Sequence, residues 1–133
     1  MKLRSMFVGA AALLTLSSFA ALAEDFVGGA VVSTDIGGQS VLTDANGMTL
    51  YTFDKDTAGV TNCYDQCAIN WPPLIADASA TAEGDFTLVD RTDGTKMWAY
   101  KGMPLYLWVK DTQPGDTNGD GVGEVWHTAV AGM

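Results

Sequence analysis

The chain repeats itself at a spacing of about 55 residues, and this internal repeat limits its possible folds more than any other feature. Residues 47–57 correspond to residues 102–112, and at the same offset Asp65 matches Asp120 and Trp71 matches Trp126. Between residues 47–71 and residues 102–126, nine aligned positions are identical. Average composition would give about one or two identities over an alignment of this length. The sequence therefore predicts two related repeats, at about 35–76 and 86–133, within a single domain at residues 24–133.

The first 23 residues have the pattern of a secretory signal peptide. Lys2 and Arg4 form a short basic start, an apolar run follows over residues 6–20, and the segment ends on small residues up to Ala23. The run is short for a membrane span, so we expect cleavage after Ala23 and a periplasmic or secreted protein. The cleavage site has no cysteine that could accept a lipid, and we expect no membrane span elsewhere.

The mature chain is strongly acidic. Loss of Lys2 and Arg4 leaves five basic residues against 16 acidic ones, so the net charge changes from −9 to −11. Nucleic acid is not an expected partner, because phosphate binding depends on Lys and Arg. The acidity can serve solubility alone, or it can attract cations and basic partners. At about 110 residues the mature chain fits one small domain, which we expect to be a monomer.

Short β-branched and aromatic segments between Gly, Asp and Asn turns predict an all-β domain of about seven short antiparallel strands. Asn46-Gly47 is a strong hairpin signal, and Asp93-Gly94 marks another turn. A helical turn is expected only within residues 62–69, and residues 75–84 are predicted to connect the repeats. The strands are expected at residues 27–33, 40–43, 48–53, 86–90, 96–100, 104–109 and 124–130.

The aromatic residues of the repeated segment share one face of their strands, because side chains alternate between faces with a period of two. These residues are Tyr51, Phe53, Tyr106 and Trp108. We expect them to form the cores of the two repeats, covered by Trp71 and Trp126. An aromatic-lined ligand groove is the alternative interpretation.

One aspartate closes each copy of the repeated segment, Asp56 in the first and Asp111 in the second. We expect each carboxylate to accept hydrogen bonds from backbone N–H groups of its turn. A carboxylate pair for acid–base catalysis is the functional alternative. Equivalent turn residues of two repeats need not converge on one site, so we favour the structural interpretation.

Cys63 and Cys67 are the only cysteines, and they stand four residues apart in a chain predicted to be exported. An oxidising compartment favours a disulfide between them. The small ring that it closes would raise the free energy of unfolding by about 2 kcal/mol, because it restricts the unfolded chain. A metal-binding or redox-active thiol pair is the alternative, although the spacing matches neither a thioredoxin motif nor a haem-attachment motif.

The acidic loop at residues 116–124 resembles the first part of a calcium-binding loop. Its twelfth position is His127 rather than the Glu that closes an EF-hand, so a metal-free turn is the main expectation and calcium the alternative. At the 55-residue offset this loop corresponds to residues 61–67. The first repeat would then close its loop covalently and the second by side-chain hydrogen bonds or an ion. The tentative calcium ligands are Asp116, Asn118, Asp120, Val122 and Glu124.

His127 is the only histidine, and we expect it to be packed or hydrogen-bonded. Copper is a weaker alternative, because imidazole and thioether groups are ligands that copper accepts. A copper site would require at least two groups to converge, from among His127 and the methionines. The candidates are Met48, Met97 and Met103.

Both copies of the repeated segment fit the pattern Tyr-x-aromatic-x-x-Asp, and Trp71-Pro72-Pro73-Leu74 follows the cysteine segment. With the Asp93-Gly94 turn and the segment from Gly115 to His127, these motifs resemble a family of bacterial secreted-repeat proteins that includes predicted lipoproteins. The resemblance covers nearly all of the mature chain and implies an exported domain built from repeats. It implies no established activity and assigns no catalytic residue. It does not imply a lipid anchor here, because the acylated cysteine of the lipoprotein members is absent.

No motif of a familiar enzyme class is present. The sequence has no Gly-x-Ser-x-Gly elbow, no His-Glu-x-x-His, no P-loop and no dinucleotide-binding motif. We therefore expect a non-enzymatic binding or interaction protein of the cell envelope, whose partner is a protein or another envelope component. A metal-binding protein is the first alternative, and a thiol redox protein that uses Cys63 and Cys67 is the second.

Overall fold

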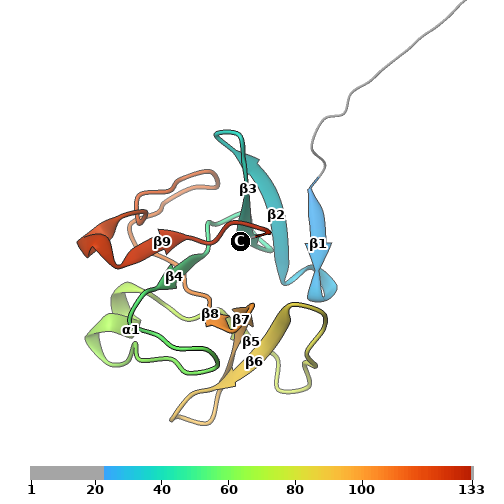
Figure 1. Ribbon diagram of the computed structural model, residues 1–133, viewed down its shortest axis with the longest axis vertical. Helices are drawn as coiled ribbons and strands as arrows, with labels where there is room; N and C mark the ends of the chain where they lie inside the picture. The colour runs from blue at the N-terminus through green and yellow to red at the C-terminus, as the bar shows by residue number, and fades with distance from the viewer. Residues whose placement is uncertain (1–22, 133) are drawn as a thin grey trace, which may run out of the picture.

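The computed structural model describes residues 23–132, which form short strands in antiparallel sheets with little helix (Figure 1). The predicted signal peptide lies outside the described residues except for Ala23. The all-β prediction is confirmed, with nine strands in the described residues where about seven were expected. The strands are β1 (Glu24–Phe26), β2 (Val31–Ile36), β3 (Gln39–Asp44), β4 (Tyr51–Phe53), β5 (Ile75–Ala76), β6 (Phe86–Asp90), β7 (Lys96–Tyr100), β8 (Met103–Pro104) and β9 (Trp126–Thr128).

Strands of the two repeats are hydrogen-bonded to one another in two of the three sheets. The first sheet has the order β1–β2–β3 and belongs to the N-terminal half alone. In the second sheet β4 of the first repeat pairs with β9 of the second. In the third sheet β5, at the end of the first repeat, pairs with β7, which also pairs with β6 and β8. The repeats are therefore interleaved and do not form two separate lobes.

Of the predicted strands, 86–90 and 96–100 form β6 and β7 as expected, whereas 48–53 and 124–130 are shortened to β4 and β9. Two other segments differ more strongly. Residues 27–29 form a 3-10 turn (η2, Val27–Gly29), because Val27 and Gly28 have φ values of 46° and 72° that a strand cannot contain. Residues 104–109 do not pair along one partner. Leu105 donates to Trp98 and Leu107 donates to Pro72, so the segment changes partner at each step.

Helical structure within residues 23–132 is confined to short segments. The helix α1 (Gln66–Asn70) overlaps the segment at residues 62–69 where a helical turn was expected. A second 3-10 turn, η3 (Val122–Glu124), precedes β9. The predicted connector at 75–84 begins with β5 rather than with irregular chain.

Strand alternation divides the buried side chains between two clusters. Leu50 and Leu105 pack in one cluster, whereas their neighbours Tyr51 and Tyr106 pack in the other. The predicted faces are therefore correct, but the expectation of one aromatic core per repeat is wrong. The two motif segments lie side by side, so their aromatic faces merge into one core. Its aromatic members are Tyr51, Phe53, Trp71, Tyr106 and Trp126, with Trp108 packed against them.

Four rings of this shared core form a continuous stack. Trp71 and Trp126 are nearly parallel, with their centroids 3.8 Å apart. Trp108 stacks on Trp71 at 3.9 Å, and Phe53 stacks on Trp126 at 4.2 Å. Phe53 and Trp108 thus each stack on the tryptophan of the other repeat. Such pairs contribute about 0.5–1.5 kcal/mol each beyond the area they bury.

Two tyrosines meet the edge of the stack, and a glycine allows one of them to pack there. Tyr51 is nearly perpendicular to Trp71 at 5.4 Å, and Tyr106 is nearly perpendicular to Trp126 at 5.2 Å. A Cβ atom on Gly119 would lie 2.8 Å from the Tyr51 ring and 2.9 Å from the Trp71 ring. This position therefore requires glycine because of space rather than backbone conformation.

We predict that Gly119→Ala destabilises the protein by about 1–3 kcal/mol, because the added methyl group must displace a ring of the stack. Urea unfolding of the exported protein measures the difference. Asn118→Ala, which changes an exposed neighbouring side chain, is the control and should stay within about 0.5 kcal/mol of wild type. Equal stability of the two variants would contradict the close packing at Gly119.

Candidate functional site

Tyr51 and Tyr106 occupy the same position in the two repeats and face each other in an antiparallel bridge. The Tyr51 N–H donates to the Tyr106 carbonyl at 2.8 Å, and the Tyr106 N–H donates to the Tyr51 carbonyl at 3.0 Å. Because equivalent residues exchange equivalent bonds, the repeats are related by an approximate twofold axis through this bridge.

Each tyrosine hydroxyl bonds to the aspartate of the other repeat. Tyr51 donates to Asp111 Oδ2 at 2.6 Å, and Tyr106 donates to Asp56 Oδ2 at 2.6 Å. All four side chains are buried. We call this pair of crossed hydrogen bonds the Tyr–Asp exchange. The sequence analysis missed it, and the equal spacing of Tyr and Asp in the two repeats was its only signal.

The second oxygen of each carboxylate holds a loop in place. Asp56 Oδ1 accepts the Asn62 N–H at 2.7 Å, and Asp111 Oδ1 accepts the Asn118 N–H at 3.0 Å. These donors are backbone N–H groups, as expected, but they lie in the loop that follows the motif and not in its own turn. One carboxylate therefore connects a loop of its own repeat to the tyrosine of the other.

Both hydroxyls of the Tyr–Asp exchange also accept one hydrogen bond. The Gly119 N–H donates to the Tyr51 hydroxyl at 3.1 Å, and the Thr61 hydroxyl lies 2.5 Å from that of Tyr106. Because the single Tyr106 proton points to Asp56, Thr61 must be the donor. The buried hydroxyls thus have partners for donor and acceptor alike, which burial in a low-dielectric site requires.

Burial dominates the electrostatics of the Tyr–Asp exchange. Burial, followed by the hydrogen bond to a carboxylate, raises the pKa of Tyr51 and of Tyr106 far above the usual value for tyrosine. Burial also raises the pKa of Asp56, while the hydrogen bonds from Tyr106 and Asn62 and the charge of Arg91 act in the opposite direction. The protons therefore stay on the tyrosines, and the exchange acts as a fixed connection.

Cys63 and Cys67 form the predicted disulfide, with their Cα atoms 5.2 Å apart. Next to the bridge, the buried Arg91 guanidinium donates to the Cys63 carbonyl at 3.1 Å and lies 4.5 Å from the centre of the Tyr64 ring. The residues that the structure describes contain no free cysteine. A thiol redox role stays a prediction without geometric support.

The acidic loop at 116–124 is closed by hydrogen bonds that its carboxylates accept from backbone N–H groups. Asp116 Oδ2 accepts the N–H groups of Thr112 and Gln113 at 2.9 and 3.2 Å. Asp120 Oδ1 accepts that of Thr128 at 3.1 Å. The two carboxylates therefore stabilise different parts of the chain. Within residues 23–132 no three His, Cys, Asp or Glu side chains are placed to hold a metal ion.

The other tentative calcium ligands also have structural places. Asn118 is exposed and donates its N–H to Asp111, and Val122 and Glu124 form the ends of η3. The geometry gives the calcium site no support, and calcium binding stays a prediction. The two corresponding loops thus close by different means, a disulfide in the first repeat and carboxylate-to-backbone bonds in the second.

His127 lies on β9 with its Nε2 atom 2.9 Å from Asp54 Oδ2. Beside it is a hollow of about 310 Å³, which Met103 also lines. Met97 is instead fully buried in the aromatic core, and Met48 is not part of the lining. One of the three candidate methionines therefore shares a hollow with the histidine.

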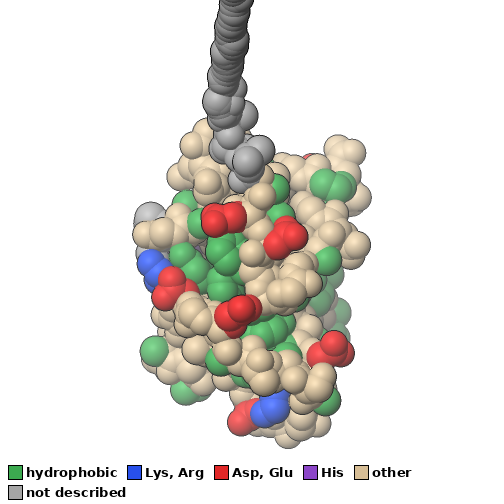
Figure 2. All heavy atoms as spheres, turned by 90° about the vertical axis from the view of Figure 1, so that its right-hand side faces the viewer, with side chains coloured by type: hydrophobic (Ala, Val, Ile, Leu, Met, Phe, Trp, Pro, Cys, Tyr) green, Lys and Arg blue, Asp and Glu red, His purple; other side chains and the backbone are tan. Residues whose placement is uncertain are grey.

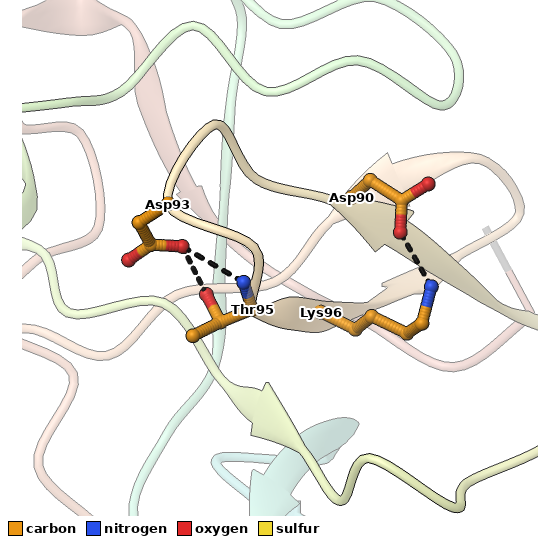
Figure 3. Close-up of polar contacts among 4 residues, drawn as sticks. All are labelled: Asp90, Asp93, Thr95 and Lys96. Atoms are coloured by element: carbon orange, nitrogen blue, oxygen red, sulfur yellow. Dashed lines mark hydrogen bonds and ion pairs between the residues drawn. The ribbon is translucent and has the colours of Figure 1, made fainter.

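The hairpin of β6 and β7 shows how acidic side chains can be occupied within the fold (Figure 3). Asp93 accepts the N–H and the hydroxyl of Thr95 at 2.9 and 2.6 Å, and Asp90 pairs with Lys96 at 2.6 Å. The hydrogen bonds from Thr95 lower the pKa of Asp93. Both carboxylates serve the hairpin itself.

A different set of carboxylates lines a surface trough that the sequence analysis missed. Two adjoining hollows, of about 580 and 450 Å³, share Val27, Gly28 and Glu83 in their lining. No Lys, Arg or His lines either hollow. The face with β1 and β6 carries acidic side chains spaced around exposed hydrophobic ones (Figure 2). We call these hollows the acidic trough, and its carboxylates are those of Asp25, Asp77, Glu83 and Asp85.

The carboxylates of the acidic trough are not neutralised within the protein. Residues 23–132 contain two ion pairs, Lys96 with Asp90 and His127 with Asp54, and neither pair belongs to the trough. The trough could not be predicted because its two walls, residues 25–28 and residues 77–86, are far apart in the sequence. Only the fold brings them together.

A family model described as a secreted repeat of unknown function matches the chain twice, at residues 30–75 and 87–130. These matches cover more than half of the 133 residues. The chain belongs to this family of secreted repeats. Each secreted repeat contributes one tyrosine and one aspartate to the Tyr–Asp exchange. Each hydrogen bond of the exchange joins residues 30–75 to residues 87–130.

No significant match to this secreted repeat protein was found among curated proteins or among solved structures. Across residues 23–132, no helix is long and apolar enough to cross a membrane. The family is described as secreted, which agrees with the export predicted from the first 23 residues. The chemistry of the site must therefore be inferred from its own geometry.

We predict that Tyr106→Phe destabilises the protein by about 1–3 kcal/mol, because it removes the partner of Asp56 Oδ2 and of the Thr61 hydroxyl. Tyr51→Phe should have a similar effect through Asp111. Urea unfolding measures both. Tyr64→Phe, which keeps the ring under Arg91, is the matched control and should change the free energy of unfolding by less than about 0.5 kcal/mol. Equal free energies of unfolding for all three variants would show that the Tyr–Asp exchange does not stabilise the protein.

Proposed function

We propose that this secreted repeat protein is a non-enzymatic binding domain of the cell envelope, and that it recognises a positively charged partner through the acidic trough. The trough carries the proposal, because its four carboxylates face solvent with no basic residue among them. In a chain with a net charge of −9, such a concentration of like charge raises the local concentration of cationic partners.

The buried acids support a structural role rather than a catalytic one. Asp56 and Asp111 each bind a tyrosine hydroxyl with one oxygen and a backbone N–H with the other. Acid–base chemistry at either carboxylate would have to break the bonds that join the two repeats. The trough carboxylates have no such duty, so they can bind a partner without cost to the fold.

Electrostatic attraction to the trough acts only over a short distance. Surface charges act over a screening length of about 8 Å at physiological ionic strength, so only a partner that enters the trough gains fully from it. Attraction of this kind mainly raises the rate of association and weakens as salt is added. A cationic partner bound here should therefore show strong dependence on ionic strength.

We expect the exported protein to bind labelled oligolysine and not labelled oligoglutamate, with affinity that falls as salt rises. Fluorescence anisotropy measures both. The double variant Glu83→Gln and Asp85→Asn should weaken oligolysine binding about tenfold, equal to 1.4 kcal/mol.

The control variant combines Asp65→Asn with Glu124→Gln, which removes the same charge at exposed positions outside the trough. It should retain most of the affinity. If both double variants weaken binding equally, the attraction is diffuse and the trough is not the site. Failure to bind oligolysine at low salt would also contradict the proposal.

A copper-binding role is a second candidate, supported by one observation. His127 and Met103 line the same hollow, and imidazole with thioether is a ligand combination that Cu(I) accepts. Nothing comparable supports calcium at residues 116–124, where the two aspartates bind different backbone groups.

If His127 and Met103 bind Cu(I), the ion kept reduced with ascorbate should raise the unfolding midpoint. An ion present at about 100 times its dissociation constant adds about 2.7 kcal/mol. Met103→Leu should abolish the shift, and Met48→Leu, outside the hollow, should preserve it. An unchanged midpoint in wild type would remove the copper candidate.

A further inference from the structure

Three aromatic rings form a strip along the acidic trough, from β1 to the hairpin of β6 and β7. Phe26 lies 5.1 Å from Phe86, and Phe86 lies 5.0 Å from Tyr100, measured between ring centroids. Phe86 is buried, whereas Phe26 and Tyr100 are partly exposed, and all three line one of the hollows. Ring faces beside carboxylates suit Lys and Arg, whose charge and hydrocarbon stem are attracted by different parts of such a surface.

The strip lies between two strands that end their sheets. β1 is the last strand of the sheet β1–β2–β3, and β6 is the last strand of the sheet β5–β7–β6. Both are on the same side of the molecule (Figure 1). End strands present backbone N–H and C=O groups that an extended chain can pair with.

We infer that the partner recognised by the acidic trough is an extended polypeptide segment in which Lys or Arg alternates with apolar residues. The inference rests on the proposed function, because it assigns a partner class to the same trough. Side chains of an extended segment alternate between two faces. One face of the segment meets the carboxylates, and the other meets the aromatic strip.

Other cationic partners match the trough less completely. A metal ion would need several converging ligands, and the described residues place no three acidic, His or Cys side chains to hold one. A polyamine could contact the carboxylates and the rings as a Lys side chain does, but it has no backbone N–H and C=O groups to pair with β1 or β6. The larger hollow also has an apolar group in its lining, Ile75, whose side chain is 50 % exposed. An anionic membrane surface would be repelled by the acidic face.

Three labelled peptides of eight residues test the inference by fluorescence anisotropy with the exported protein. One alternates Lys with Val, the second alternates Lys with Ser, and the third alternates Glu with Val. We expect the Lys–Val peptide to bind about tenfold more tightly than the Lys–Ser peptide of equal charge, and the Glu–Val peptide not to bind. Phe26→Ala should remove most of the tenfold difference, and Ile69→Ala, an exposed residue outside the trough, should preserve it.

The outcomes separate this inference from the proposed function. Equal affinity for the Lys–Val and Lys–Ser peptides would overturn the polypeptide inference and leave a purely electrostatic trough. No binding of either peptide, together with no binding of oligolysine, would overturn both. Because Phe26→Ala could lower stability, amide shifts of wild-type protein in NMR titrations give a second measurement. Shifts confined to residues 25–28, 83–86 and 100 are expected, and shifts elsewhere would place the peptide at another site.

Discussion

The Tyr–Asp exchange is the interaction on which the rest of this structure depends. Tyr51 and Tyr106 pair through their backbones, and each hydroxyl bonds to a buried aspartate of the other repeat at 2.6 Å. Each aspartate then fixes the loop that follows it, and these loops lie against the stack of aromatic rings. Since every buried donor and acceptor in the exchange is satisfied, the core can contain two carboxylates without the usual cost of burying them.

The acidic residues fall into two groups, one that stabilises the fold and one that forms the proposed binding surface. Carboxylates inside or near turns, such as Asp56 and Asp93, have partners within the fold. Those of the acidic trough have none among the ion pairs of the described residues. The trough lies between β1 and the second repeat, so its shape depends on the same core that joins the repeats.

Local patterns in the sequence were sufficient for part of this structure. The repeat, the two-residue alternation around Tyr51 and Tyr106, and the Cys63–Cys67 disulfide were all predictable, because each depends on residues close together or on identical spacing. The crossed bonds were not predictable, since nothing in one repeat indicates that its tyrosine bonds to the other. The segment at 104–109 was wrongly predicted to be one continuous strand for a related reason. Its strand-like pattern does not reveal that its partners change residue by residue.

The acidic trough could not be found from the sequence, since its walls come from residues near 25 and near 83.

The Tyr–Asp exchange has a consequence that extends beyond this chain. A polypeptide with only one such repeat would have a tyrosine and an aspartate that cannot satisfy each other. It could complete the arrangement only by meeting a second polypeptide of the same kind. Folding units built on this plan should therefore contain repeats in even number, either within one chain or by association of chains with one repeat each.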